Sequence, residues 1–292
     1  MSVCKLCPRH CGVDRKNRLG FCGVGSDPVV ARAGLHFWEE PCISGSKGSG
    51  TVFFSGCNLR CVFCQNYDIS TGGTGKRISV DRLKEIYQEL IAKGAHNINL
   101  VTPTHFADAI AKSLSEKLPV PVVYNSNGYE SIETLQKLSG KIQIYLPDLK
   151  YSDDAAAWKY SHCRDYFATA TAAIREMFRQ TGKYILDPDT GLLHSGVVIR
   201  HLVMPGMLDN TFRVIDFVKE NFRPGEVLFS LMRQYVPCGD AASFPEIDRK
   251  LTDEEYDAAE EYLFNSGIED GFVQEKESAG REFIPAFDLT GV

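Results

Sequence analysis

The sequence lacks any long apolar run, any internal repeat and any low-complexity tract. No stretch approaches the roughly 18 uncharged apolar residues of a membrane span, so we expect no transmembrane helix and no membrane partner. Residues 1–18 contain no apolar core of the kind found in signal peptides, and we therefore expect a cytoplasmic protein. Hydrophobic residues make up 43% of the chain and charged residues 24%. These values exclude a wholly disordered chain, a collagen and a coiled coil.

An excess of positive charge is also missing. The chain has 32 Lys and Arg against 38 Asp and Glu, which gives a formal net charge of −6. A mildly acidic balance argues against general binding to duplex nucleic acid, and we expect no nucleic-acid partner. The length of 292 residues suits one large α/β domain or two medium ones.

Cysteine, in contrast, is abundant, with ten residues in the chain. In a reducing compartment this number calls for an explanation other than disulfides. Thiolates two or three residues apart can converge on one metal or cluster. Two groups have such spacing: one is Cys4, Cys7, Cys11 and Cys22, and the other is Cys57, Cys61 and Cys64. The remaining cysteines, Cys42, Cys163 and Cys238, are scattered, and we expect them to be inert.

Strand and helix patterns alternate along most of the chain. Strand patterns lie at 51–54, 97–102, 121–125, 142–147, 197–203 and 227–232, and helical patterns at 79–94, 105–117, 131–138, 153–180, 209–222 and 252–267. This order predicts parallel strands joined by right-handed crossovers, in either a doubly wound sheet or a barrel. Polar residues follow several strands at the end where both architectures bind ligands, namely Thr102, Asn125, Asp148 and Gln234.

Residues 1–50 differ from the rest, because they are rich in Gly, Cys and Ser and show no helical periodicity. We interpret them as a Cys-rich, metal-binding extension, followed by the main domain over residues 51–292. The spacing Cys4-x2-Cys7-x3-Cys11-x10-Cys22 supplies four thiolates, enough to close a site for zinc or for an auxiliary iron–sulfur cluster. His10 is a possible substitute ligand, and free buried thiols are the alternative.

The second cysteine group follows the strand pattern at 51–54 directly. Cys57-x3-Cys61-x2-Cys64 lies in a loop, residues 55–66, that contains no fourth cysteine or histidine. A closed structural zinc site requires four protein ligands, whereas an iron–sulfur cluster held by three cysteines leaves one iron open to an outside ligand. We call residues 55–66 the cluster loop.

The cluster loop, with Phe63 before its last cysteine, resembles the signature of radical S-adenosylmethionine enzymes. Three further segments resemble strand-end motifs of pyruvate formate-lyase activating enzymes and their homologues: Asn125-Ser126-Asn127-Gly128, Asp148-Leu149-Lys150 and Arg200 to Gly206. Another three are similar to an uncharacterised branch of that group: the Cys4 to Gly12 block, the Phe53-Phe54-Ser55-Gly56-Cys57 entry and Leu231 to Tyr235. The resemblance covers about residues 4–270.

This resemblance implies a partial (β/α)6 TIM-like barrel. It also implies a [4Fe-4S] cluster on Cys57, Cys61 and Cys64, whose open iron is chelated by the amino and carboxylate groups of S-adenosylmethionine. One electron, from a donor of the flavodoxin or ferredoxin type, then cleaves the sulfonium, and the 5′-deoxyadenosyl radical abstracts hydrogen from a substrate.

The resemblance further implies which residues contact S-adenosylmethionine: Phe63, Thr102, Thr104, Asn125, Asn127, Asp148, Lys150, Arg200 and Gln234. Phe63 lies against the adenine in this interpretation, although plain core packing is the alternative. Asp148 resembles a residue that binds a monovalent cation or orients the site. Arg200 and His201 point to opposite faces of a strand, and we expect Arg200 to line the cavity.

Two departures from the family pattern weaken parts of this assignment. Relatives carry Gly-Gly-Glu where this chain has Thr102-Pro103-Thr104. This segment therefore has no carboxylate that could bind the ammonium group of the methionine part of S-adenosylmethionine. Gln234 stands where activating enzymes often carry histidine.

Three functions remain open at this point. The first is an enzyme that activates a partner protein by taking hydrogen from one of its glycines. The second is the same radical chemistry on a small molecule or on a residue of another peptide. The third is a non-catalytic iron–sulfur electron-transfer protein.

Overall fold

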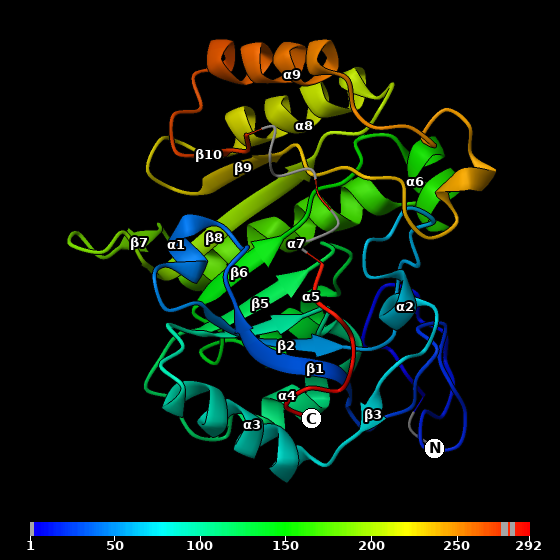
Figure 1. Cartoon of the computed structure of the whole chain (residues 1–292), viewed down its shortest axis with the longest axis vertical. Helices are drawn as coiled ribbons and strands as arrows, with labels where there is room; N and C mark the ends of the chain where they lie inside the picture. The colour runs from blue at the N-terminus through cyan, green and yellow to red at the C-terminus, as the bar shows by residue number, and fades with distance from the viewer. Residues whose placement is uncertain (1–2, 276–279, 281–283) are drawn as a thin grey trace.

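The computed structural model describes residues 3–275, 280 and 284–292. Its centre is a run of six parallel strands, paired in chain order (Figure 1). These are β2 (Ser49–Phe54), β4 (Ile98–Val101), β5 (Val122–Ser126), β6 (Ile144–Pro147), β8 (Leu193–Leu202) and β9 (Leu228–Met232). Helices connect them, so the fold is α/β, a partial TIM-like barrel, as the resemblance implies.

All the helices of the described chain that follow β2, apart from α2 and η2, lie within or next to the helical patterns of the sequence. The helices after β2 are α2 (Tyr67–Ser70), α3 (Val80–Ala92), η1 (Thr104–Phe106), α4 (Ala107–Ser113), α5 (Ile132–Lys137), α6 (Asp154–Ser161), α7 (Tyr166–Thr181), α8 (Leu208–Asn221), η2 (Ala241–Ser243) and α9 (Asp253–Ser266). The pattern at 153–180 is two helices, because His162 adopts a left-handed conformation with φ of 52° and ends α6.

Additional strands extend the parallel run at both sides. β1 (Val29–His36) pairs antiparallel with β2, and the short β3 (Lys76–Arg77) pairs with β1. β10 (Gly271–Val273) is parallel to β9, and β7 (Ile185–Leu186) pairs antiparallel with β8. Because β1 lies within residues 1–50, the segment interpreted as an extension contributes a strand to the main sheet.

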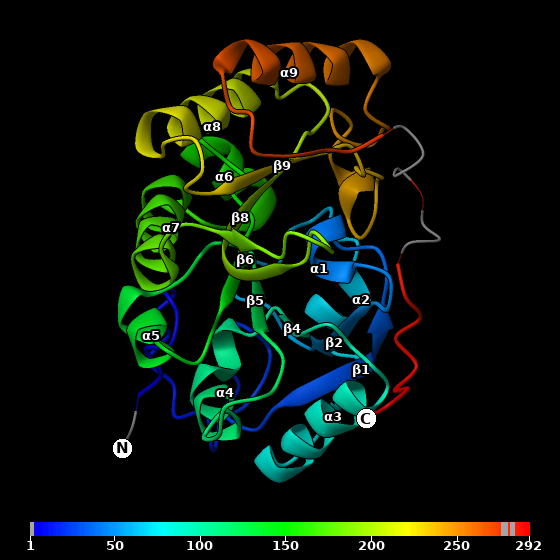
Figure 2. The same ribbon diagram turned by 90° about the vertical axis from the view of Figure 1, so that its left-hand side faces the viewer.

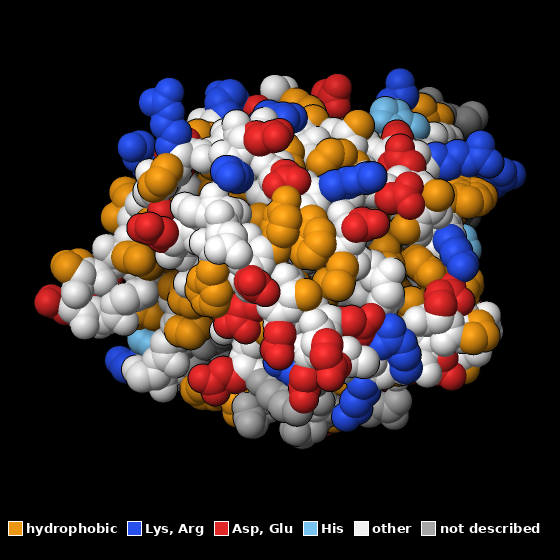
Figure 3. Space-filling view, turned by 90° about the horizontal axis from the view of Figure 1, so that it is seen from above, with side chains coloured by type: hydrophobic (Ala, Val, Ile, Leu, Met, Phe, Trp, Pro, Cys, Tyr) orange, Lys and Arg blue, Asp and Glu red, His pale blue; other side chains and the backbone are white. Residues whose placement is uncertain are grey.

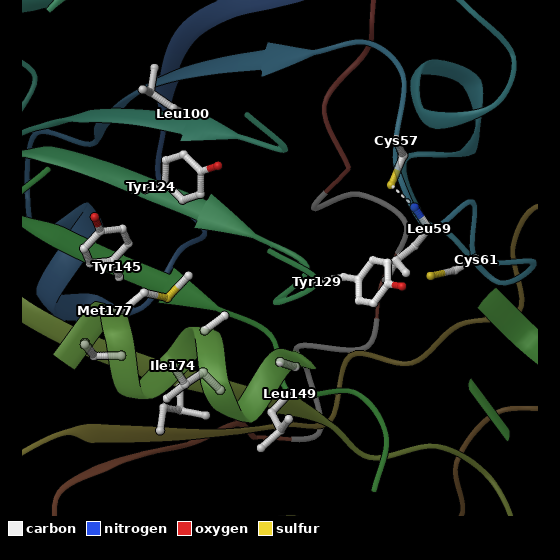
Figure 4. Packing of buried hydrophobic residues seen from close by; sticks show 14 of the residues in the cluster. Cys57, Leu59, Cys61, Leu100, Tyr124, Tyr129, Tyr145, Leu149, Ile174 and Met177 are labelled. Atoms are coloured by element: carbon white, nitrogen blue, oxygen red, sulfur yellow. Dashed lines mark hydrogen bonds between the residues drawn. The ribbon is translucent and has the colours of Figure 1, made fainter. Parts of the chain in front are cut away.

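The core has two sides. On the outer side, Tyr145 of β6 lies beside Met177 of α7, and Tyr124 of β5 lies between Leu100 and Tyr145 (Figure 4). The inner side is filled by the short helix α1 (Pro41–Ser44), which enters from the segment between β1 and β2 (Figures 1 and 2). Its Cys42 and Ile43 pack against strand residues Val123, Ile144, Leu146, Val198 and Leu228.

The surface over α8 and α9 mixes acidic, basic and apolar side chains (Figure 3). This intermixing agrees with the small net charge of the chain. In the part of the chain that the structure describes, no helix is both long and apolar enough to cross a membrane.

Candidate active site

The cluster loop leaves β2 at the carboxyl end of the strand and carries its three cysteines in sequence. Figure 4 shows Cys57 and Cys61 on this loop beside Tyr129. Each sulfur accepts a hydrogen bond from a different part of the chain: Asn127 Nδ2 lies 3.4 Å from Cys57 Sγ, Ser161 Oγ 2.9 Å from Cys61 Sγ, and Ser70 Oγ 3.4 Å from Cys64 Sγ. Such donors suit thiolates that bind a metal cluster.

The thiols are strongly shielded from water. Burial raises the pKa of Cys61 to about 12 and that of Cys64 to about 11. These two residues are therefore neutral thiols at pH 7 in the metal-free chain, and a bound metal must displace their protons.

The three cysteines open into a cavity of about 220 Å³ at the carboxyl ends of the parallel strands. Most residues that the resemblance assigns to S-adenosylmethionine line the same cavity. These are Phe63, Thr102, Asn125, Asn127, Asp148, Lys150, Arg200 and Gln234. Five segments separated in sequence therefore place polar side chains in one cavity, together with the aromatic ring of Phe63.

Thr104 is the one member of the set that lies outside the cavity lining. It is fully buried, and its hydroxyl donates to Glu130 Oε1 at 2.5 Å. Tyr124 OH donates to the other oxygen of Glu130 at 3.1 Å. Burial raises the pKa of Glu130 to about 7, against the lowering effect of these two hydrogen bonds. Thr104 thus serves a buried polar cluster behind the sheet.

Charged side chains form a connected network on the cavity floor. Arg200 Nε and Nη2 contact Asp148 Oδ1 at 2.9 and 2.8 Å, and Lys150 Nζ lies 2.6 Å from Asp148 Oδ2. Burial alone would raise the pKa of Asp148, but the charges of Arg200 and Lys150 reverse this and hold it below its usual value. Asp148 is therefore an ionised carboxylate with a cation on each oxygen.

Glu39 completes this network and was not anticipated from the sequence. Its carboxylate is 3.0 Å from Arg200 Nη1 and accepts from Asn99 Nδ2 at 3.0 Å and from Asn125 Nδ2 at 3.1 Å. It arrives from the segment between β1 and α1, 161 residues before Arg200. The available signal was two adjacent acidic residues in an otherwise Gly- and Ser-rich stretch.

Glu40, the next residue, is buried beneath the network. Its Oε2 has no hydrogen-bond partner in the described residues, and burial raises its pKa above the ordinary value although Arg200 opposes the shift. The floor therefore pairs Glu39 with Arg200, and Asp148 with both Arg200 and Lys150, and the carboxyl group of Glu40 lies buried next to them.

The backbone at Thr102 is strained where it meets the cavity. Thr102 has a φ of 57°, in the left-handed region that β-branched residues rarely adopt. Such a conformation costs on the order of 1–3 kcal/mol and persists only where surrounding contacts impose it. Here Thr102 N donates to Asn125 O at 2.8 Å, which ties the end of β4 to β5.

Two histidines and one scattered cysteine of the described chain have structural surroundings. His201 faces away from the cavity, with Nδ1 2.7 Å from Leu149 O and Nε2 3.0 Å from Thr211 Oγ1. Arg200 is the residue of that pair that lines the cavity, as expected. His105 is buried, with Nε2 2.8 Å from Ser55 O. Cys42 lies in the inner core beside α1.

The four N-terminal cysteines lie near one another, outside this cavity. Cys7 and Cys22 are buried, whereas His10 is exposed. Among the described residues, no three His, Cys, Asp or Glu side chains are close enough together to hold a single metal ion.

The fold and the site together define a barrel protein with a thiol-lined cavity at its carboxyl-end face. A family model described as the Radical SAM superfamily matches residues 51–217. More than half of the chain is matched, and the chain belongs to the radical SAM superfamily.

Comparison with individual proteins agrees with this assignment. An uncharacterised protein, MJ0674 of Methanocaldococcus jannaschii, is 33% identical over 266 residues, which cover 88% of this chain and 72% of that protein. SuiB of Streptococcus suis has a similar fold, with a TM-score of 0.51 and 14% identity over 75% of this chain and 47% of SuiB. A mutant of spore photoproduct lyase gives a TM-score of 0.50 and 12% identity, over 76% of this chain and 74% of the lyase. The chain thus spans about half the length of SuiB.

The residues present fit the cofactors that the superfamily implies. Three thiols on one loop each receive a hydrogen bond and share a cavity with strand-end donors and acceptors. Cys57, Cys61 and Cys64 would hold a [4Fe-4S] cluster. The strand ends would hold S-adenosylmethionine.

Proposed function

We propose that this protein is an enzyme that cleaves S-adenosylmethionine reductively and uses the 5′-deoxyadenosyl radical to abstract hydrogen from a substrate. The bound cluster supplies the single electron, which it receives from a cytoplasmic donor of the flavodoxin or ferredoxin type. The observation that carries the proposal is the shared cavity of the three thiols and the strand-end polar residues. A simple electron carrier needs no such cavity.

The chain's own residues divide the work in this proposal. Phe63 provides an apolar wall for the adenine, and Asn125 and Gln234 offer donors and acceptors to the ribose and the methionine carboxylate. Asn127 offers only its oxygen, because both of its N–H groups are bonded to Cys57 Sγ and Asn58 Oδ1. Lys150 supplies positive charge beside Cys61. We do not include Thr104, because its hydroxyl is bonded to Glu130. We also place no monovalent cation at Asp148, because two cationic side chains already occupy its oxygens.

Glu39 takes the place of the missing carboxylate of the Gly-Gly-Glu motif in this proposal. It reaches the cavity from outside the barrel strands and accepts from Asn99 and Asn125. Its second oxygen is held by Arg200, which fixes its direction. An ammonium group in the cavity would meet a carboxylate that is already oriented.

Anaerobic reconstitution with iron, sulfide, dithionite and S-adenosylmethionine tests the chemistry. We expect 5′-deoxyadenosine from the wild-type protein and none above background from Cys57→Ala. Cys163→Ala is the matched control, because Cys163 is buried outside the cavity, and it should retain the wild-type yield. The proposal that the protein is an enzyme would be contradicted if the reconstituted wild-type protein formed no 5′-deoxyadenosine, or if Cys57→Ala gave an undiminished yield.

For the substrate we propose a polypeptide, with a glycine of a glycyl-radical protein as the specific version. The rim of the cavity carries Trp38, 59% exposed, and the neighbouring Phe37 is 48% exposed. Exposed aromatic side chains at a cavity entrance suit the docking of a protein loop. The alternative is a small molecule.

Electron spin resonance separates these two substrate classes. A protein-based glycyl signal should form when a candidate partner is added to the reduced enzyme with S-adenosylmethionine. A reproducible lack of that signal, with 5′-deoxyadenosine formed and a metabolite consumed, would assign a small molecule instead. Trp38→Ala should raise the KM for a protein substrate and leave that for S-adenosylmethionine nearly unchanged.

A further inference from the structure

The cysteine block, residues 4–22, brings its four thiols near one another, although not within metal-binding distance, and residues 3–28 form no helix or strand in the described chain. Cys11 lies close enough to Cys4 for the two thiols to influence each other's ionisation. Cys22 is close enough to Cys4, Cys11 and Cys7 to interact with each of them electrostatically. Gly20 separates two of the sulfurs, because a Cβ at that position would lie 3.3 Å from Cys22 Sγ and 3.5 Å from Cys11 Sγ.

A buried cation accompanies these thiols. Arg15 is 8% exposed and lies close enough to Cys22 to interact with it electrostatically. Its Nη1 and Nη2 donate to His105 O and Gly25 O, but its Nε has no partner among the described residues. The guanidinium therefore leaves one N–H donor and a positive charge available next to the thiols, where a bound centre with anionic ligands would be stabilised.

The cysteine block is attached directly to the cluster loop. Cys57 N donates to Cys22 O at 3.2 Å. Gly56 has a φ of 85°, and a Cβ there would lie only 2.6 Å from Cys22 O. Only glycine permits this close approach, so the backbone of Cys22 packs directly against Gly56.

Arg9, between Cys7 and Cys11, makes a second attachment. Its Nε donates to Asn58 O at 2.7 Å and its Nη2 to Ser161 O at 3.1 Å, and its guanidinium stacks 4.1 Å from the centre of the Phe21 ring. Ser161 in turn donates from Oγ to Cys61 Sγ at 2.9 Å. The block therefore contacts the surroundings of two of the three cysteines on the cluster loop.

We infer that the four thiols of the cysteine block bind one centre of +2 charge, a zinc ion or an iron–sulfur cluster, and that this centre braces the cluster loop. The inference rests on the proposed function for the identity of the braced cluster. Metal binding brings the four sulfurs within coordination distance of one another, as it does in small domains that lack a core of their own. Cys22 O and Arg9 then hold Cys57 and Cys61 in the positions that the radical cluster requires.

Metal analysis of the reconstituted full-length protein tests the first half. We expect about one zinc ion or about four irons per chain in addition to the cluster on Cys57, Cys61 and Cys64. Zinc content and Mössbauer spectra distinguish the two. Cys7→Ser/Cys11→Ser should lose this second centre, and Cys163→Ser, the matched control, should keep it. A wild-type chain with no metal on these thiols would overturn the inference.

Cluster stability tests the second half. Loss of a supporting contact around a metal site lowers its affinity 10–100-fold, so a chelator should remove iron from Cys57, Cys61 and Cys64 about 10-fold faster in the double variant. Arg9→Ala should do the same while retaining the second centre, which guards against simple misfolding of the double variant. Arg18→Ala, on the exposed part of the block, should behave as wild type. Unchanged iron loss from both the double variant and Arg9→Ala would contradict the bracing role.

These readouts are independent of the proposed reaction. Both metal centres with no 5′-deoxyadenosine would reject the proposed function and leave the second centre in place. Formation of 5′-deoxyadenosine with empty N-terminal thiols would do the opposite.

Discussion

At the scale of single residues, the donors to the three sulfurs have the clearest chemical consequence. Ser161, Ser70 and Asn127 come from α6, α2 and the end of β5, and each donates to a different cysteine. Hydrogen bonds to cluster sulfurs stabilise the reduced, more negative state and so raise the reduction potential. The ease of reducing the cluster is therefore set by residues outside the cysteine motif.

Replacing Ser161 by Ala should make the midpoint potential of the cluster more negative, because Cys61 loses its donor. Ser70→Ala should shift it in the same direction through Cys64. The measurement is an anaerobic redox titration followed by electron spin resonance. Ser243→Ala, whose hydroxyl contacts only Asp240 among the described residues, is the control. Potentials equal to wild type in both test variants would refute the assignment of these donors.

The raised pKa of Glu130 should make the free energy of unfolding depend on pH. Its pKa is raised by burial to about 7, from an ordinary value of 4.5. The contribution of Glu130 to the free energy of unfolding is fully present below about pH 4.5. It is lost as the pH rises through 7, because ionising this carboxyl group costs more free energy in the folded chain than in the unfolded chain. Between pH 5 and 8 this group alone should lower the free energy of unfolding by ~2 kcal/mol.

Urea unfolding of wild type and Glu130→Gln at pH 5 and pH 8 checks this expectation. The variant should lack this part of the decline, since glutamine does not ionise. Glu133→Gln on the exposed side of α5 should keep the wild-type slope. Parallel pH profiles for wild type and Glu130→Gln would show that Glu130 does not titrate in this range.

At the scale of elements, α9 shows how local sequence sets a boundary. Thr252 Oγ1 accepts from Glu255 N at 3.2 Å, and Glu255 Oε2 accepts from Thr252 N at 3.0 Å. Gly267 ends the helix with a φ of 85°. These are the start and stop that the sequence predicts, because capping depends only on residues three or four apart.

Thr252→Ala should destabilise the protein by about 1 kcal/mol, because the amide at Glu255 loses its cap. Thr252→Ser keeps the hydroxyl and should restore most of that loss. Chemical denaturation at constant pH measures both. Equal stability of the alanine and serine variants would argue that the cap is not energetically important here.

At the scale of the whole molecule, the C-terminal residues 284–292 close one side of the cavity. Leu289 N donates to Ala31 O at 3.0 Å and Ala33 N to Thr290 O at 2.8 Å, so this segment pairs with β1. Phe287 packs on Phe53 with ring centres 5.6 Å apart. Ile284 and Pro285 belong to the cavity lining.

Ending the chain after residue 283 should expose the cavity and speed the loss of the cluster in air. The absorbance of the reconstituted cluster, followed after mixing with oxygen, gives the rate. Phe264→Ala on the exposed surface of α9 provides a control with unchanged rate. Equal bleaching rates for the truncated and full-length chains would show that the segment does not shield the cluster.

Not all of the site could be predicted from local patterns. The alternation of strands and helices, the cluster loop and most strand-end residues follow from short-range periodicity and spacing. Thr104 was predicted to contact S-adenosylmethionine, but the turn after the strained Thr102 directs its hydroxyl to Glu130. Local sequence does not reveal which side of a strained turn a side chain takes.

The sequence by itself determined the fold class, the cluster loop and the superfamily, because these depend on residues near one another in the chain. Only the tertiary structure decided that Glu39 meets Arg200, that Cys22 supports Cys57, and that the C-terminal segment covers the cavity. These contacts join segments far apart in sequence. They form because segments that precede β2 and follow β10 pack against the face where the parallel strands end, and no local pattern encodes that packing.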